Sequence, residues 1–412
     1  MNELVVGLDV GTNKICTVVA EVRTDDIFVV GVGIEPSQGM KKGIVSDINS
    51  LSRAISASVH KAERMSGYEI ERAFVSVAGN HISSVNSRGV TGIPTQRSVS
   101  MDDVEKAMEA ARAIAIPHGR EVLHVVPRSF SLDGQEKVRS PIGMHGFRLE
   151  VEAHIITASS TSLANLEQAV ESAGVFVDRF ILNPLASGEA ILTDAERDMG
   201  VVVIDIGGGT TDLAIFIDGT VWHTVVIPVS GSHVTNDITH VIRISAEDAE
   251  SVKLKYGCAI PKKVDSLETF IVQPFGEGYP TEIKRRDLAL VIEARVEELF
   301  EKVLQEIKRS GYDGLLRAGA VLTGGGSQLD GLKEIAESIL QMPVRIGKPE
   351  RLTGMADSLK SPSFSTSIGL LRMGLMMDSA SGQNTQDNPT LNLNLWGMLQ
   401  GLFRRFIPDD RE

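Results

Sequence analysis

VVVIDIGGGTTDLAIFID, residues 201–218, is the most informative stretch of the chain. Residues 201–204 form a continuous β-branched run, the pattern of a strand buried on both faces. The run ends at Asp205, and the three glycines that follow allow a tight turn and the close approach of a ligand to the backbone. Because an apolar run resumes at Leu213, the loop joins two strands instead of opening a helix. This excludes a P-loop, whose G-x-x-x-x-G-K-S/T pattern requires a helix start and a lysine.

The loop between these two strands has the composition of a phosphate-binding site. Backbone N–H groups in glycine-rich turns, with hydroxyl groups beside them, bind phosphate oxygens. Asp205 stands at the strand end beside the expected phosphates, where a carboxylate is placed to hold Mg²⁺ through its water ligands. The residues predicted to surround the phosphates here are Gly207, Gly208, Gly209, Thr210 and Thr211.

The same order of elements occurs near the N-terminus. An apolar run at residues 4–8 is followed by Asp9, Gly11 and Thr12 and by a second run at 15–20. Two such hairpins, half the chain apart, predict two like-folded halves that close on one nucleotide from opposite sides. The predicted nucleotide-contacting residues of this loop are Gly11, Thr12, Asn13 and Lys14, although a solvated lysine is the alternative for the last of these.

A third glycine loop follows later in the chain. Residues 320–323 form a short apolar strand, the loop is Gly324, Gly325 and Gly326, and residues 329–340 have the pattern of an amphipathic helix. The counterpart in the first half is the stretch 73–80, AFVSVAGN, which is also a strand that runs into glycine.

These motifs together resemble the ATPase superfamily of actin, heat-shock chaperones and sugar kinases, and within it the FtsA family of bacterial cell-division actin homologues. The resemblance extends over most of residues 1–375. It implies an α/β, actin-like (ribonuclease H-like) fold with duplicated halves around a nucleotide cleft, an inserted α/β subdomain, and ATP and Mg²⁺ as ligands. The stretches that carry it are GLDVGTNKIC from Gly7, NPLASGEAIL from Asn183, VVIDIGGGTTDLAIF from Val202, IPVSGSHVTNDI from Ile227, AEDAESVKLKYGCA from Ala246 and LTGGGSQLDG from Leu322.

The resemblance also implies roles for single residues. Asp9 and Asp205 would organise the water ligands of Mg²⁺. Asn183 stands before Pro184, where actin has glutamine and the chaperones glutamate, the residue that orients the attacking water. Because asparagine is shorter and cannot act as a base, we expect slow ATP hydrolysis at most, with nucleotide binding more important than turnover.

A second pair of residues is expected to contact the nucleoside. Glu250 and Lys253 lie three apart on one face of a predicted helix at 246–257, with Ser245 as its N-cap. By resemblance this pair faces the ribose and base, together with the loop at 324–326. Without the resemblance, an exposed salt-bridged pair is an equally good interpretation.

Residues 81–160 interrupt the first half and predict an inserted subdomain with a helix at 102–114 and strands near 121–130 and 151–157. Two helices rich in small residues, at 182–192 and 365–374, are expected to cross closely and form a hinge between the halves. The expected boundaries are 1–80, 161–199 and 355–377 for the first half, 200–244 and 311–354 for the second half, 245–310 for an outer lobe whose residues 262–284 are irregular, 378–394 for a flexible linker and 395–408 for a C-terminal helix.

The composition limits the function classes. A net charge of −13 over 412 residues argues against a nucleic-acid binder, which usually has a basic surface. The two cysteines, Cys16 and Cys258, are too few for a disulfide framework or a zinc site. Because the chain has neither a signal-peptide pattern nor an apolar run of the ~18 residues that a transmembrane helix needs, we expect a cytoplasmic protein.

The C-terminal sequence LWGMLQGLFRRFI predicts an amphipathic helix. Its apolar side chains fall on one half of a helical projection, while Gln400 and two arginines fall on the other. Such a helix is suited to an anionic lipid surface, and packing on the protein's own core is the alternative. One short helix binds reversibly, so a polymer that presents several would bind by avidity. The predicted membrane contacts are Trp396, Leu399, Phe403, Arg404, Arg405 and Phe406.

The resemblance therefore implies an ATP-binding, actin-like cell-division protein that polymerises at the cytoplasmic face of the bacterial inner membrane, at the division site. It would tether the FtsZ ring by binding the FtsZ C-terminal tail at the outer lobe, and recruit later division proteins through residues 81–160. A small-molecule kinase and an actin-like pilus-assembly protein are the alternatives. The membrane helix discriminates best, because a kinase has no use for it and a pilus protein docks on a partner's peptide.

Overall fold

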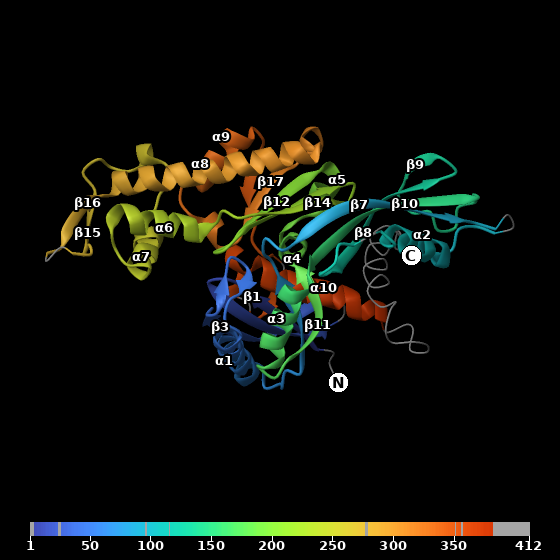
Figure 1. Cartoon of the computed structure of the whole chain (residues 1–412), viewed down its shortest axis with the longest axis horizontal. Coiled ribbons are helices and arrows are strands. Elements are labelled where there is room, and N and C mark those ends of the chain that lie inside the picture. Colours follow the sequence, from blue (N-terminus) through green and yellow to red (C-terminus); the bar gives the residue numbers. More distant parts are fainter. Residues whose placement is uncertain are drawn as a thin grey trace.

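The computed structural model describes residues 4–23, 26–94, 97–114, 116–276, 279–350, 352–355 and 357–381. The predicted C-terminal helix, with all six predicted membrane contacts, lies outside these residues. Figure 1 shows the arrangement: the first half lies below, and above it an elongated layer carries the outer lobe at one end, the second half in the middle and the inserted subdomain at the other end. Within the described ranges no helix is both long enough and apolar enough to cross a membrane.

The first half is built on a six-stranded sheet of order β11-β6-β1-β2-β3-β19. Helices α1 (Ile48–Ser66) and α3 (Ser160–Glu171) pack on one face, and α4 (Asn183–Ile191) and α10 (Ser365–Ser381) on the other. The strands are β1 (Leu4–Val10), β2 (Lys14–Arg23), β3 (Asp26–Pro36), β6 (Arg72–Val77), β11 (Phe176–Leu182) and β19 (Thr353–Gly354), with a small separate hairpin of β4 (Met40–Lys41) and β5 (Ile44–Val45).

The second half repeats this plan in a five-stranded sheet of order β14-β13-β12-β17-β18. In each half the first strand is antiparallel to the next one and parallel to a later one, β6 for β1 and β17 for β12. The predicted duplication is therefore present. The strands are β12 (Val201–Ile206), β13 (Thr211–Ile217), β14 (Thr220–Ile227), β17 (Gly319–Thr323) and β18 (Val344–Ile346), and a short helix α5 (Asp194–Met199) precedes them.

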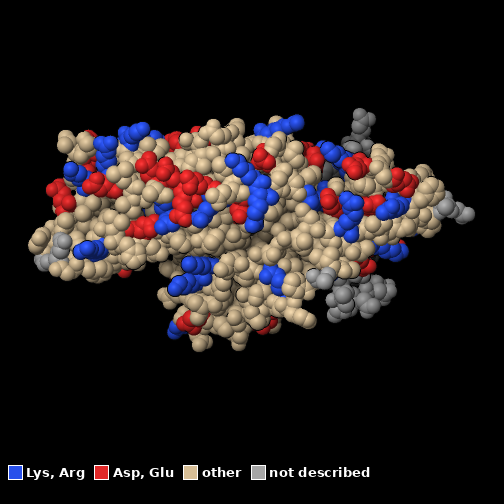
Figure 2. Space-filling view, turned by 45° about the horizontal axis from the view of Figure 1, so that its top comes forward, with Lys and Arg blue, Asp and Glu red and all other residues tan. Residues whose placement is uncertain are grey.

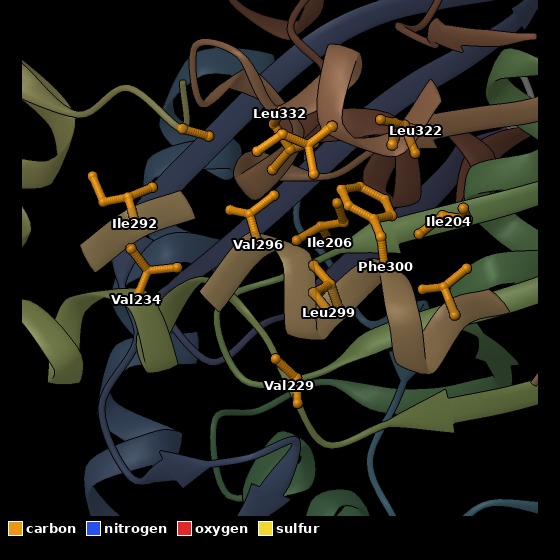
Figure 3. Packing of buried hydrophobic residues seen from close by; sticks show 14 of the residues in the cluster. Ile204, Ile206, Val229, Val234, Ile292, Val296, Leu299, Phe300, Leu322 and Leu332 are labelled. Carbon is orange, nitrogen blue, oxygen red and sulfur yellow. The ribbon is translucent and has the colours of Figure 1, made fainter. Parts of the chain in front are cut away.

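Helices cover the outer face of the second sheet. Figure 3 shows side chains of α8 (Arg285–Ser310) packed against β12, β17 and α9 (Leu332–Leu340) in one continuous apolar cluster. Phe300, which is fully buried, lies among the aliphatic side chains of these elements. The predicted helix at 329–340 begins three residues late, because a 3₁₀ turn (Gly325–Gln328) and the left-handed Gly331 (φ 80°) precede it.

The two small-residue helices α4 and α10 cross closely between the sheets, as predicted. A Cβ atom on Gly369 would lie 1.7 Å from the Ala186 carbonyl oxygen, so only glycine permits this contact. The α10 backbone continues to Ser381, and the helix therefore ends inside the segment predicted as linker from residue 378.

The outer lobe contains α7 (Ala246–Tyr256) and α8, and α6 (Gly231–Ile242), which precedes the predicted boundary at residue 245, packs against both. Residues 262–284 were expected to be irregular, and this expectation is wrong. They contain a 3₁₀ turn (Pro261–Lys263) at their start and the hairpin of β15 (Thr269–Val272) and β16 (Thr281–Lys284). The hairpin strands are short, and Phe270 anchors them by stacking on Tyr256 at a centroid distance of 4.7 Å.

The inserted subdomain is a four-stranded sheet of order β7-β10-β8-β9 with α2 (Met101–Arg112) on one face. The predicted helix and the two long strands, β8 (Arg120–Leu132) and β10 (Arg148–Ser159), are present. Sequence analysis missed β9 (Gln135–Val138) and the edge strand β7 (Ser83–Gly92). The β7 sequence SSVNSRGVTG is mostly polar, and its two valines are exposed, so it lacks the apolar pattern of a strand.

Candidate functional site: a cleft between the two halves

A cavity of about 310 Å³ lies where the two halves meet. It is lined by the ends of β1 and β12, the N-termini of α4 and α6, and residues of α7 and the third glycine loop. The structure brings together every site residue proposed for the nucleotide except Thr211. The Thr211 hydroxyl points into the second half and donates to the Val229 carbonyl oxygen at 2.7 Å.

The two phosphate hairpins have matching backbone geometry and touch each other. Gly11 N–H donates to the Lys14 carbonyl oxygen at 3.0 Å, and Gly207 N–H donates to the Thr210 carbonyl oxygen at 3.0 Å. A Cβ atom on Gly209 would lie 2.3 Å from the Thr12 hydroxyl oxygen, and one on Gly208 would lie 2.4 Å from the Asn13 amide oxygen. These glycines therefore also allow the second hairpin to pack on the first.

Asp9 is the second-to-last residue of β1 and is held by hydroxyl groups from two distant segments. Ser76 donates to its Oδ1 at 3.0 Å and Ser367 to its Oδ2 at 2.9 Å. Burial raises the pKa of Asp9, and Lys14 acts in the opposite direction. The carboxylate is thus oriented before any ligand binds.

Asp205 is the second-to-last residue of β12 and faces a second carboxyl group that the sequence pattern did not reveal. Thr366 donates to Asp205 Oδ2 at 3.2 Å, and Asp212 lies opposite Asp205 in the register of β12 and β13. Burial, and secondarily Asp9, raises the pKa of Asp205 to about 6. Burial and then Asp205 raise the pKa of Asp212 well above its ordinary value. The available signal was an acid between the glycine loop and the apolar run that begins at Leu213.

Lys14 is a cation beside these acids, and its side chain also contacts the residues just before α10. Its Nζ donates to the Ser363 carbonyl oxygen and lies 3.4 Å from the centre of the Phe364 ring. Burial lowers the pKa of Lys14, and Asp9, with further contributions from Cys16 and Asp205, acts against that. The lysine therefore joins the first hairpin to the 3₁₀ turn (Pro362–Phe364) that leads into α10.

Asn183 is the first residue of α4 and lines the cavity. Its side-chain oxygen Oδ1 is buried and has no hydrogen-bond partner within the described part of the chain. A buried acceptor without a donor is costly, so this atom fits a site whose ligand or water supplies the donor.

The pair predicted for the nucleoside lies on α7. Lys253 Nζ lies 2.7 Å from Glu250 Oε2 and also donates to the Thr235 hydroxyl oxygen at 2.9 Å. The third glycine loop approaches from the other side, where a Cβ atom on Gly324 would lie 2.3 Å from Asp205 Oδ1. Gly324 also has a φ of 79°, which favours glycine.

A metal ion has no preformed set of protein ligands here. Among the described residues there is no group of three or more His, Cys, Asp or Glu side chains with metal-binding geometry. Beyond the effect of burial, Asp9 raises the pKa of Asp205, and Asp205 raises the pKa of Asp212. A divalent cation held through its water ligands would relieve that repulsion without direct coordination by all three.

Comparison with known proteins identifies the family. A family model described as "Cell division protein FtsA" matches residues 202–369, and one described as "SHS2 domain inserted in FTSA" matches residues 79–157. The cell division protein FtsA of Pseudomonas aeruginosa is 44% identical over 92% of this chain and 90% of its own length. The chain belongs to the FtsA family. FtsA of Escherichia coli strain K12 is 36% identical over 96% of both chains, and FtsA of Bacillus subtilis is 37% identical over 90% of this chain and 83% of its own.

Solved structures confirm the actin-like α/β fold. A PilM–PilN type IV pilus biogenesis complex has a TM-score of 0.67 at 18% identity, over 90% of this chain and 98% of its own. MreB5 of Spiroplasma citri bound to ADP has a TM-score of 0.55 at 17% identity, over 93% of this chain and 99% of its own. At such identities the likeness concerns the fold alone. The FtsA relatives, at 36–44% identity, favour a cell-division protein over the pilus-assembly alternative.

Proposed function

We propose that this FtsA-family chain binds ATP with Mg²⁺ in the cleft between its halves and uses the bound nucleotide to control assembly into polymers. The observation that carries this proposal is the pair of matched hairpins, whose glycines and buried acids line one cavity. MreB5 of Spiroplasma citri, which shares the fold, has been solved with ADP and with AMPPNP. Gly11, Thr12, Asn13 and Lys14 hold the phosphates from one side, and Gly207, Gly208, Gly209 and Thr210 from the other.

In this proposal Asp9 and Asp205 hold the water ligands of Mg²⁺, and Asn183 orients the attacking water. Glu250, Lys253 and the loop of Gly324, Gly325 and Gly326 bind the nucleoside. When ATP bridges the two hairpins the cleft closes, and the crossing of α4 and α10 is where the halves turn. Hydrolysis is slow, because an asparagine amide cannot take a proton from water.

We further propose that the polymer lies on the cytoplasmic face of the inner membrane at the division site. The C-terminal amphipathic helix binds anionic lipid, and polymerisation strengthens that binding by avidity. Figure 2 shows basic and acidic side chains interspersed over the upper layer, so that face lacks the continuous basic surface that suits nucleic acid.

The partners proposed for this protein are other division proteins. The outer lobe binds the C-terminal tail of FtsZ, and exposed apolar side chains on and beside its hairpin support this docking: Leu267 is 86% exposed, Ile271 72% and Phe275 67%. The inserted subdomain, residues 81–160, binds later division proteins.

Sedimentation with anionic liposomes, ATP and Mg²⁺ tests the membrane proposal. The full chain should pellet with the liposomes, and a chain that ends at Ser381, where α10 ends, should stay in the supernatant. Phe403→Glu should act like the truncation, whereas Gln400→Glu, which adds the same charge on the opposite half of the helix, should retain most binding. Equal pelleting of full and truncated chains would refute the tail as the anchor.

A further inference from the structure

A buried hydrogen bond joins the inserted subdomain to the residue that precedes Asn183 of the nucleotide cleft. Among the residues that the structure describes, strand β11 is an edge strand of the first sheet and pairs with β6 alone, so its outer N–H groups need other partners. The N–H of its last residue, Leu182, donates to Nε2 of His124 at 3.0 Å. His124 belongs to β8 of the inserted subdomain, 58 residues earlier in the chain.

His124 can accept this hydrogen bond because its ring is neutral. Burial, with a smaller contribution from Arg179, lowers the pKa of His124 to about 3. The ring is therefore uncharged near neutral pH, with a free lone pair on Nε2 and the proton on Nδ1. The bond acts as a geometric restraint and not as a pH switch.

The restraint acts one residue away from the site. Leu182 is the N-cap of α4, and the next residue is Asn183, whose unpartnered Oδ1 is buried at the cavity. Pro184 follows and fixes the backbone of the first turn. The body of α4 is held by its close crossing with α10, and its N-terminal end is held by the pairing of Leu182 with Val77 of β6 on one side and by the His124 contact on the other.

We propose that His124 is a positioning residue, which sets the orientation of Asn183 in the nucleotide cleft and so couples the inserted subdomain to that site. A displacement of β8 by a partner bound to the inserted subdomain reaches Asn183 through this bond and the peptide between Leu182 and Asn183. The consequence for ATP hydrolysis rests on the nucleotide-binding function proposed above. The restraint on the orientation of Asn183 is independent of that function.

The first test observes Asn183 directly. The full chain is labelled with ¹⁵N-asparagine, and the side-chain amide signal of Asn183 is assigned by its loss in Asn183→Asp. His124→Leu removes the acceptor and should shift or broaden that signal. His124→Gln, whose amide oxygen can replace Nε2, should restore it. An unchanged Asn183 signal in His124→Leu would overturn the proposal.

His154 supplies a matched control. It is also a buried neutral histidine of the inserted sheet, on β10, with a pKa lowered to about 3, chiefly by burial. Its ring nitrogens lie 2.7 Å from Asn86 Oδ1 and 3.0 Å from the Thr224 hydroxyl oxygen, so it contacts β14 and not β11. His154→Leu should leave the Asn183 signal in place. A shift as large as that of His124→Leu would mean general loosening of the subdomain and would overturn the proposal.

The second test separates positioning from stability by kinetics. Because coupling through one such contact typically changes a rate several-fold, His124→Leu should lower kcat for ATP about threefold to thirtyfold with KM unchanged. In an Asn183→Ala background the same substitution should cause no further loss. Equal losses in both backgrounds would contradict the proposal. If the unsubstituted chain does not bind ATP, the proposed function fails, and the amide signal still tests the restraint.

Discussion

The two phosphate hairpins have the same backbone and different chemistry. Asp9 and Asp205 occupy equivalent strand ends, and in both hairpins the following turn closes with the same 3.0 Å hydrogen bond. Across the register, however, Asp9 faces Cys16 and Asp205 faces Asp212. Burial raises the pKa of the Cys16 thiol to about 12, so the first hairpin holds one acid beside a neutral group and the second holds two acids.

The difference shows that the duplicated fold determines where the ligand binds. The residue opposite each acid, Cys16 or Asp212, determines which hairpin bears the larger cost of burying charge. Lys14 interacts with both acids, but more strongly with Asp9, which also has two hydroxyl donors. Asp205 accepts from Thr366 and faces another carboxyl group. The second hairpin is therefore the part that gains most from a bound cation.

Making the first hairpin like the second should have the largest effect. Cys16→Asp would place a carboxyl group at a fully buried position directly opposite Asp9. We expect a loss of about 4 kcal/mol or more in the free energy of unfolding, because two buried acids would face each other and would have to share Lys14 as counterion. Urea denaturation measures this, with Cys16→Ser as the control for the lost thiol. A loss no greater than that of the control would mean that the hairpins are electrostatically interchangeable.

Removing the charge from the second hairpin should stabilise the ligand-free protein. The pKa of Asp205 is raised from 3.8 to about 6, so the folded state holds its proton more tightly, and stability from this group falls as pH rises from about 4 to 6. Asp205→Asn should remove that slope and raise the free energy of unfolding at pH 7.5 by up to ~3 kcal/mol. Stabilisation by ATP with Mg²⁺ should disappear. Urea titrations from pH 4.5 to 7.5 check both, and a variant as pH-dependent as the parent would contradict the assignment.

The two turns also differ in the residue that closes them. Lys14 and Thr210 occupy equivalent positions, and the first is a cation while the second is neutral. Lys14→Met should weaken ATP binding about tenfold to a hundredfold, the range for loss of a charge-assisted hydrogen bond. Thr210→Val, which removes a neutral hydroxyl, should weaken it less. Calorimetric titration with ATP and Mg²⁺ gives both constants. Equal losses would imply that Lys14 keeps its contact with Ser363 when nucleotide binds.

The cleft could be predicted from the sequence because each of its motifs lies within a short stretch of the chain. Each hairpin has its apolar runs, its acid and its glycines within about twenty residues, and the repetition at half the chain length specifies the fold. Sequence patterns did not predict the contacts that join residues far apart in the chain. The contact of Lys14 with Ser363 joins residues 349 apart, and that of His124 with Leu182 joins residues 58 apart. Strand β7 was missed because its position depends on packing against α2, where a Cβ atom on Gly89 would lie 1.9 Å from the Ala107 carbonyl oxygen.

Substitution of Thr211 should have the smallest effect. It tests whether every residue of the second glycine-rich hairpin loop contacts the nucleotide. Thr211 directly follows Thr210 in the glycine loop, yet strand alternation turns the two side chains to opposite faces. Its hydroxyl binds the Val229 carbonyl oxygen and lies outside the cavity lining. Thr211→Val should therefore cost about 1 kcal/mol of unfolding free energy for the lost hydrogen bond, and leave ATP affinity unchanged. Thr211→Ser, which keeps the donor, should recover part of the stability. If Thr211→Val weakened ATP binding as much as Thr210→Val, the loop would have to rearrange on binding, and the matched geometry of the two hairpins would belong to the ligand-free state alone.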